Sequence, residues 1–165
     1  MYVFLDTEFT NLALDAKPIS VGFVAQDGAR AFYAESADWR REECSEFVIE
    51  SVLPLLDGPA YPIAELGLRI KAWLEDLGPG ISLLSDSPDY DLAILNTVLH
   101  GCGWPGNVRR ALAALPTEGT LATIFRNAFE EAMVGLRTHH ALDDARGNRY
   151  AYLMTRKACP YWRPR

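Results

Sequence analysis

The sequence has few cysteines, and it lacks any hydrophobic run long enough to cross a membrane. Its three cysteines, Cys44, Cys102 and Cys159, are far apart and form no Cys-x-x-Cys pair, which excludes a cysteine zinc site and a disulfide framework. Every apolar run falls short of the roughly 18 to 20 residues of a membrane span. The first residues also lack the basic start and long apolar stretch of a signal peptide. We therefore expect a cytoplasmic protein with no membrane partner.

The composition excludes a disordered chain. Hydrophobic residues make up 49% and charged residues 23% of the 165 positions, and both values are close to the globular average. No internal repeat, low-complexity tract or long linker divides the chain. Because single cores commonly organise about 100 to 200 residues, we expect residues 1–165 to form one domain.

The net charge of −6 argues at first against a polyanionic partner such as nucleic acid. The charge is unevenly distributed, however. Residues 1–105 carry 6 basic and 17 acidic side chains, whereas residues 106–165 carry 10 basic and 5 acidic ones. Such a split is compatible with an acidic metal-binding centre beside a basic surface, although solvated helix faces would explain it equally well.

Short apolar runs and stretches of helical spacing alternate along the chain, which predicts an α/β domain. Asp27-Gly28 is a two-residue turn typical of hairpins and separates two of the expected strands. Five strands are predicted, at residues 2–6, 19–26, 29–34, 81–84 and about 110–115. Five helices are predicted, at residues 40–53, 63–77, 89–101, 121–133 and 142–157. We therefore expect a mixed five-stranded sheet flanked by helices.

The first candidate for chemistry is Asp6-Thr7-Glu8, at the end of the first expected strand. Alternate residues of a strand point to the same face, so both carboxylates project together and Thr7 points to the other side. Two neighbouring carboxylates repel each other when ionised unless a cation lies between them. Hard divalent ions such as Mg²⁺ or Mn²⁺ suit oxygen ligands of this kind.

Two further groups of polar residues lie at expected helix starts. Asp91 follows Tyr90 in the first turn of one helix, where favourable interaction with the helix dipole is an adequate alternative explanation. His139 and Asp144 lie at the entry to the last helix, the histidine in the loop and the aspartate in the first turn. Capping by Asp144 or its neighbour, together with a loop histidine that titrates near neutral pH, would also explain this pattern.

Taken together, the order of these motifs resembles the DEDDh family of RNase H-like 3′-to-5′ exonucleases, over residues 2 to about 153. The most specific part is residues 139–146, which read HHALDDAR and look like the third motif of that family. Residues 5–10, LDTEFT, are similar to the first motif, and residues 90–95, YDLAIL, match the core of the second. The chain looks most like the small bacterial and phage exoribonuclease branch.

The resemblance implies an RNase H-like fold, with one antiparallel strand among the three N-terminal ones, and a two-metal-ion mechanism. Asp6, Glu8, Asp91 and Asp144 would bind two divalent ions, Mg²⁺ or Mn²⁺, and would act in catalysis with His139. The ion among Asp6, Glu8 and Asp144 would lower the pKa of a bound water, and His139 would take its proton as general base. The other ion, held mainly by Asp6, would stabilise the departing oxygen as a 5′-mononucleotide is released.

The chain departs from the family pattern in one place. Many members have His-Asn before the second motif, where this chain has Ser85-Asp86-Ser87-Pro88-Asp89, so contacts made there cannot be carried over. Asp86 and Asp89 are also rivals of Asp91 as ligands. Asp91 is preferred because it follows an aromatic residue and has apolar side chains three and four positions later.

The sequence gives less specific evidence about the residues that recognise the substrate. Phe9 and the Thr10 backbone follow the acidic pair directly and are the candidates for holding a terminal nucleotide. A core position is an equally good interpretation of Phe9. The resemblance implies short or single-stranded RNA as substrate, and dimers are common among the relatives, which makes a homodimer one expectation for the assembly. A DNA proofreading or repair exonuclease, a nucleic-acid-binding module with an inactive site and another two-metal hydrolase are the alternatives.

Overall fold

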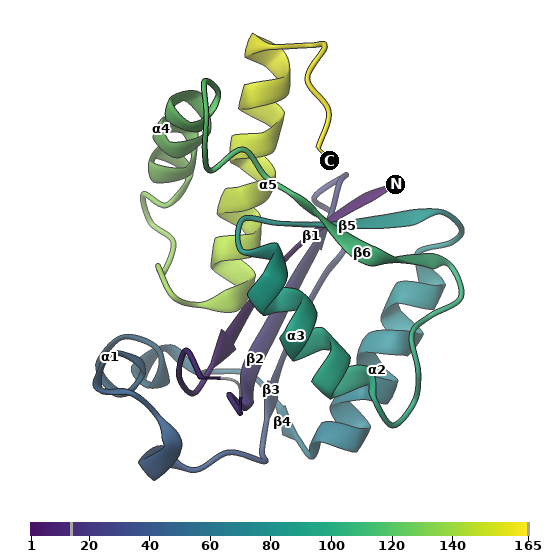
Figure 1. Cartoon of the computed structure of the whole chain (residues 1–165), viewed down its shortest axis with the longest axis vertical. Coiled ribbons are helices and arrows are strands. Elements are labelled where there is room, and N and C mark those ends of the chain that lie inside the picture. Colours follow the sequence, from purple (N-terminus) through teal and green to yellow (C-terminus); the bar gives the residue numbers. More distant parts are fainter. Residues whose placement is uncertain (14, 165) are drawn as a thin grey trace.

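The computed structural model describes residues 1–13 and 15–164. Its centre is a six-stranded sheet in the order β4-β3-β2-β1-β5-β6 (Figure 1). The strands are β1 (Tyr2–Phe9), β2 (Pro18–Ala25), β3 (Ala31–Ser36), β4 (Ala60–Tyr61), β5 (Ile81–Ser85) and β6 (Val108–Ala114). β2 runs antiparallel to β1 and β3, whereas the other neighbouring pairs are parallel. The predicted mixed α/β sheet and its antiparallel strand are therefore confirmed.

The prediction of five strands is wrong by one. The additional strand, β4, contains only Ala60 and Tyr61, which pair with Glu35 and Ser36 of β3. Two residues are too few to show the alternation that marks a strand in a sequence, and Pro62 directly follows them. Only the approach of β3 reveals this pairing.

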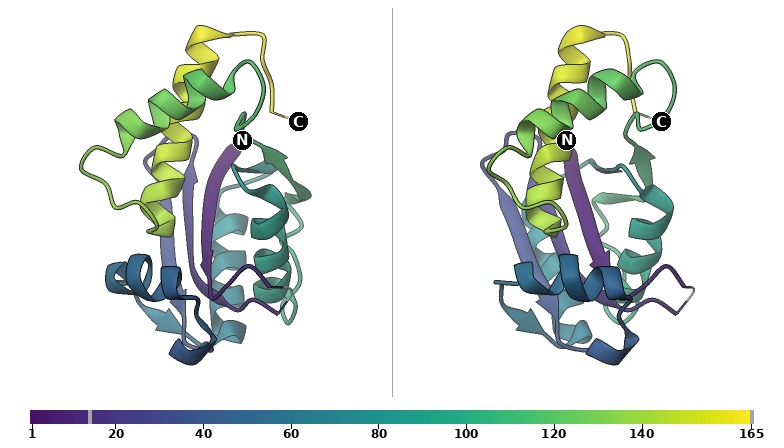
Figure 2. Two further views of the ribbon diagram at one scale, coloured as in Figure 1. Left: turned by 60° about the vertical axis from the view of Figure 1, so that its left-hand side comes forward. Right: turned by 90° about the vertical axis from the view of Figure 1, so that its left-hand side faces the viewer.

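Helices cover both faces of the sheet (Figure 2). In the described residues they are α1 (Glu46–Ser51), α2 (Ile63–Asp76), α3 (Pro88–Leu99), α4 (Ala122–Ala132) and α5 (Ala141–Ala158), with the 3-10 helices η1 (Arg41–Glu43) and η2 (Leu53–Leu55). The single helix predicted over residues 40–53 is wrong, because Ser45 caps a new helix by accepting the Val48 N–H at 3.3 Å. No helix in this part of the chain has both the length and the apolar composition of a membrane span.

Alternate residues of β1 belong to two different cores. Val3 and Leu5 pack with residues of α2 and α3, whereas Phe4 packs with residues of α4 and α5. The period of two continues along the strand, so Asp6 and Glu8 lie on the α5 face and the intervening residue lies on the α3 face. The expected orientation of the two carboxylates therefore follows from the packing of the strand.

A glycine lets α5 approach the sheet beside the first carboxylate. Gly22 of β2 is the Cα partner of Asp6. A Cβ at Gly22 would lie 2.3 Å from the backbone nitrogen of Leu142 and 2.4 Å from the carbonyl of Ala141. The first turn of α5 therefore contacts β2 backbone to backbone, which brings the residues of this turn next to Asp6.

β5, which pairs with β1 on the side away from β2, ends early and leaves room for α3. β5 pairs with β1 only through the partners of Tyr2, Val3 and Phe4. β5 ends at Ser85 and α3 begins at Pro88. Beyond this point the first turns of α3 lie beside the second half of β1, where the acidic residues are.

Candidate metal centre

Six side chains from five parts of the fold form two adjacent groups that could each hold a metal ion. Asp6, Asp86 and Asp91 form one group, and Glu8, His139 and Asp144 form the other. Within each group the candidate ligand atoms all lie within 4.8 Å of one another. All six residues line one cavity of about 360 Å³. The structure thus brings together every residue predicted to act as a ligand or as the general base.

Two hydroxyl groups orient the carboxylate of Asp91. The Thr7 hydroxyl donates to Oδ1 at 2.6 Å, and the Ser85 hydroxyl donates to Oδ2. Asp91 is 1% exposed, and the hydrogen bonds from these two hydroxyl groups favour its ionised form. Thr7 points away from the neighbouring carboxylates, as the strand period requires, and for that reason it reaches α3.

The backbone at His139 adopts a conformation that is uncommon outside glycine. Its φ angle is +68°, in the left-handed region, which few residues other than glycine adopt, although asparagine, aspartate and histidine do so more often than the rest. The His139 N–H donates to Oδ2 of Asp144 at 2.8 Å. The imidazole packs edge-to-face on Phe47, with ring centroids 4.9 Å apart. Because these two contacts come from different elements, they hold the imidazole at the cavity.

Burial shifts the titration of these groups toward the neutral forms. It raises the pKa of Glu8 to about 8 and the pKa values of Asp91 and Asp144 to about 7. The pKa of Asp6 is raised well above its usual range by burial, with smaller contributions from the surrounding carboxylates. Burial lowers the pKa of His139. Carboxylates this close together need a cation to be ionised jointly at neutral pH.

A buried oxygen atom supports the fit of a cation. Oδ1 of Asp144 has no hydrogen-bond partner among the described residues, although it is inaccessible to solvent. A buried carboxylate oxygen without a partner is costly, and a hard divalent ion is the kind of group that would satisfy it. The donor set contains five carboxylates and one imidazole, which suits Mg²⁺ or Mn²⁺.

The second histidine of the motif points away from the cavity. His140 is 2% exposed, and its ring stacks on Tyr33 with centroids 4.3 Å apart. Its Nε2 lies 3.3 Å from the carboxylate of Asp57. Arg137 joins Asp57 to Asp143 through ion pairs of 2.6 and 2.7 Å. This network anchors the loop that carries His139 to β3 and to the segment before β4.

The candidates for substrate binding have different positions. Phe9 lines the metal cavity and stacks on Tyr90, with centroids 5.8 Å apart and planes 12° from parallel. Thr10 is 1% exposed, its N–H donates to the Lys17 carbonyl, and its carbonyl accepts from the Ser45 N–H. The structure therefore brings Phe9 to the centre, whereas it uses the polar backbone groups of Thr10 to hold the loop after β1.

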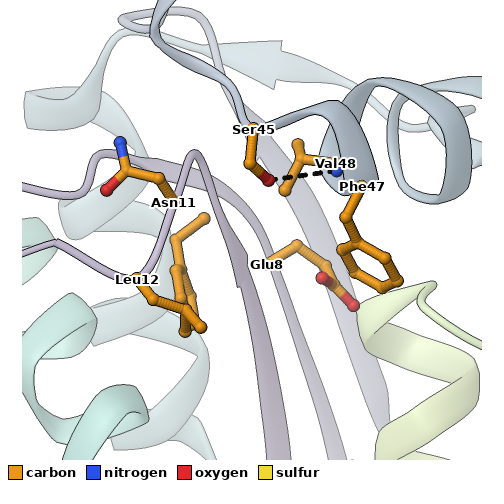
Figure 3. A pocket seen from close by; sticks show the side chains of 7 residues that line it. Glu8, Asn11, Leu12, Ser45, Phe47 and Val48 are labelled. Carbon is orange, nitrogen blue, oxygen red and sulfur yellow. Dashed lines mark hydrogen bonds between the residues drawn. The ribbon is translucent and has the colours of Figure 1, made fainter.

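Sequence reasoning missed the apolar walls of the site. A second cavity of about 360 Å³ adjoins Glu8 and is lined largely by apolar atoms (Figure 3). Leu12 and Phe47 stand on opposite sides of it, and both are unusually exposed for their type, at 76% and 52%. The segments that carry them are joined because the Ser45 N–H bonds to the Thr10 carbonyl. The sequence contains no local signal for this pairing.

Comparison with known proteins relates the chain to exonucleases. No protein-family model matches it. Curated proteins named 3′-5′ exoribonuclease from two strains of Mycobacterium tuberculosis are 37% identical to it over 76 residues, which is 46% of this chain and 45% of theirs. The chain thus matches about half the length of these relatives.

Solved structures match over nearly the whole chain. The Mg²⁺- and Mn²⁺-bound form of S. pombe Pop2p has a TM-score of 0.67 and 12% identity, over 96% of this chain and 83% of that one. The RNase domain of yeast Pop2 has a TM-score of 0.60 and 13% identity, over 97% and 77%. Exonuclease I has a TM-score of 0.58 and 12% identity, over 96% and 42%. The chain therefore shares the RNase H-like fold of these structures, as the motifs predicted.

Proposed function

We propose that the protein is a metal-dependent 3′-to-5′ exonuclease that acts on short or single-stranded RNA and releases 5′-mononucleotides. The observation that carries this proposal is the convergence of Asp6, Glu8, Asp91, Asp144 and His139 on one cavity. These residues come from β1, α3, the loop before α5 and the first turn of α5, and the exonuclease fold surrounds them. The sequence similarity to proteins named 3′-5′ exoribonuclease supports RNA over DNA as the substrate.

The four carboxylates are the residues that would hold two divalent ions. Asp6, Glu8 and Asp144 would hold one, and Asp6 with Asp91 would hold the other. When bound, Mg²⁺ or Mn²⁺ supplies positive charge to the attacking and departing oxygens of a phosphodiester and acidifies a bound water. Thr7 and Ser85 orient Asp91, and the His139 N–H orients Asp144.

His139 is the proposed general base. Burial lowers the pKa of its imidazole, so the ring is neutral and able to accept a proton at neutral pH. The ring would take one proton from the attacking water as the water oxygen bonds to phosphorus. The bond from phosphorus to the 3′ oxygen of the preceding nucleotide breaks, that oxygen takes a proton from solvent water, and the imidazolium of His139 releases its proton to solvent. The terminal nucleotide leaves with its 5′-phosphate.

The metal cavity and the apolar cavity beside it support binding of a terminal nucleotide. Phe9 and Leu12 line the metal cavity and the neighbouring cavity, and Phe47 closes the far side of the latter. Stacking on an aromatic side chain contributes about 1 to 3 kcal/mol per base and tolerates any base. Thr10 would act indirectly, by keeping this loop in place.

The proposed chemistry is tested with 5′-labelled RNA and DNA oligonucleotides of the same sequence, in Mg²⁺, in Mn²⁺ and in chelator. We expect a ladder that shortens from the 3′ end, disappears in chelator and forms faster on RNA. His139→Ala should lower the rate by roughly 10²- to 10⁴-fold, whereas His100→Ala, at the exposed end of α3, should not. Faster cleavage of DNA would favour the proofreading or repair alternative, and binding without cleavage would favour an inactive module.

A metal titration of His139→Ala distinguishes a base from a ligand. The imidazole lies among candidate ligand atoms, so both roles have to be separated. A general base predicts unchanged Mn²⁺ affinity with reduced turnover, and loss of one bound ion would instead make His139 a ligand. A single domain over residues 1–165, a homodimer and a cytoplasmic location stay predictions; light scattering on the purified chain would settle its assembly.

A further inference from the structure

We propose that Asp86 is a fifth carboxylate of the metal centre, that it binds the second ion together with Asp6 and Asp91, and that Asn148 orients it. This inference rests on the proposed function, because it concerns the same two-ion site. Asp86 lies one residue beyond the end of β5, in the segment where the chain departs from the exonuclease motif. It is therefore a feature of this chain and is not carried over from the family pattern.

The position of Asp86 fits a ligand. A carboxylate oxygen of Asp86 lies within 4.8 Å of ligand atoms of both Asp6 and Asp91. Asp86 also lines the same cavity. The remaining group, formed by Glu8, His139 and Asp144, contains ligands for one ion without it. With Asp6 shared between the two ions, Glu8 and Asp144 would complete the set for the first, and Asp86 and Asp91 would complete the set for the second.

Asp91 has limited capacity to hold the second ion. Both of its oxygens accept hydrogen bonds, one from Thr7 and one from Ser85. Hydrogen bonds of this kind orient a carboxylate and occupy part of its lone-pair capacity. Asp86 accepts a hydrogen bond at Oδ1 from Asn148, which leaves Oδ2 as the oxygen able to face the ion.

Asn148 orients the carboxylate of Asp86. It lies on α5 and is fully buried, and its Nδ2 donates to Asp86 at 3.0 Å. Its Oδ1 is buried and has no partner among the described residues. An amide oxygen that is buried without a hydrogen-bond partner is costly. The metal cavity itself contains a second such atom, the buried Oδ1 of Asp144, and a bound ion would give that oxygen a partner.

Neighbouring carboxylates provide a matched comparison. Asp89 lies three residues after Asp86, in the first turn of α3. It lines a different cavity, with Tyr90 and Thr97, and is absent from both ligand groups. Asp89→Asn therefore removes the same charge from the same segment without removing a candidate ligand.

The test is to measure Mn²⁺ binding to the metal-free full chain by calorimetry and by electron paramagnetic resonance. We expect two ions on the wild type. Asp86→Asn should weaken the binding of the second ion by about tenfold or more, the size of effect seen when groups around a metal are altered. The affinity for the first ion should be unchanged. Asp89→Asn should bind as the wild type does. Asn148→Ala should give a smaller loss in the same direction.

Thermal unfolding separates a ligand from a structural residue. Asn at position 86 can still accept the hydrogen bond of Asn148, and removing one like charge relieves repulsion with Asp6 and Asp91. Asp86→Asn should thus unfold in chelator at the same or a higher temperature than the wild type. Adding Mn²⁺ should raise its unfolding temperature by less than it raises that of the wild type. A lower unfolding temperature in chelator, with full Mn²⁺ binding, would make Asp86 structural and overturn the proposal.

The remaining outcomes keep the two proposals apart. Unchanged binding of both ions by Asp86→Asn overturns this inference while leaving the exonuclease proposal intact. A single ion on the wild type, retained by Asp86→Asn, overturns it as well. Loss of the second ion in the variant, with no cleavage of RNA or DNA by the wild type, supports the ligand assignment and contradicts the proposed function.

Discussion

The backbone N–H of His139 donates to Oδ2 of Asp144, five residues later in the first turn of α5. A single carboxylate therefore supports the left-handed loop and also belongs to the ligand group. Asp144→Asn separates these two roles, because an amide oxygen still accepts the hydrogen bond but lacks the charge. We expect an unchanged or higher unfolding temperature in chelator, and turnover lower by at least about 100-fold.

The adjacent residue is the control for this prediction. Asp143 is buried and forms ion pairs with Arg137 and Arg146. Asp143→Asn should destabilise the fold by about 1 kcal/mol or more, because it weakens charge-assisted hydrogen bonds. Its effect on turnover should be smaller than that of Asp144→Asn. Equal losses of turnover in the two variants would contradict a specific role for Asp144.

Phe47→Ala should weaken substrate binding more than it destabilises the fold. The ring is half exposed, so truncating it costs little core burial, but it forms one wall of the cavity beside Glu8. Loss of one stacking platform should raise KM by about tenfold. Leu68→Ala, at an exposed apolar position on α2, is the control. A fall in kcat with KM unchanged would instead point to the contact with His139.

The stability of the metal-free protein should fall as pH rises from 5 to 8. The pKa of Glu8 is raised to about 8 and those of Asp91 and Asp144 to about 7, whereas unfolded carboxyls titrate near 4. Between these values the folded state binds more protons than the unfolded state, so the free energy of unfolding decreases with pH. Asp143, whose pKa is lowered, stays ionised throughout this range.

Thermal unfolding in chelator at pH 5, 6, 7 and 8 checks this pH dependence. An excess of Mn²⁺ should flatten the decline, because the ion binds the ionised carboxylates. Asp91→Asn should flatten it as well, even without metal, since one of the titrating groups is gone. An unfolding temperature in chelator that rises over this interval would show that burial does not raise these pKa values.

Gly22→Ala should disrupt the packing of α5 against the sheet. The added Cβ would lie 2.3 Å from a backbone atom of Leu142, and a backbone cannot move aside as a flexible side chain can. We expect a destabilisation of about 1 to 3 kcal/mol, measured by denaturant unfolding, together with weaker metal binding. Gly106→Ala is the control because its Cβ would meet open space. Equal stability of the two variants would contradict this account of the helix position.

The sequence by itself determined the features that depend on local periodicity. The period of two in β1 places Asp6 and Glu8 on one face. The spacing of apolar residues within α2, α3 and α5 was enough to predict that these segments are helices. The order of the motifs was sufficient to predict the fold. Helix boundaries near capping residues were less predictable, as Ser45 shows, because a cap competes with apolar spacing over the same few residues.

Only the tertiary structure decided how distant segments share the site. Thr7 reaches Asp91 across 84 positions of sequence, and Asn148 reaches Asp86 across 62. The tertiary structure also separates the three candidate aspartates, because the fold brings Asp86 and Asp91 to the same cavity and leaves Asp89 outside it. Such contacts depend on where β5 ends and how closely α5 approaches β2. These are properties of packing between elements, and no local pattern of residue types encodes them.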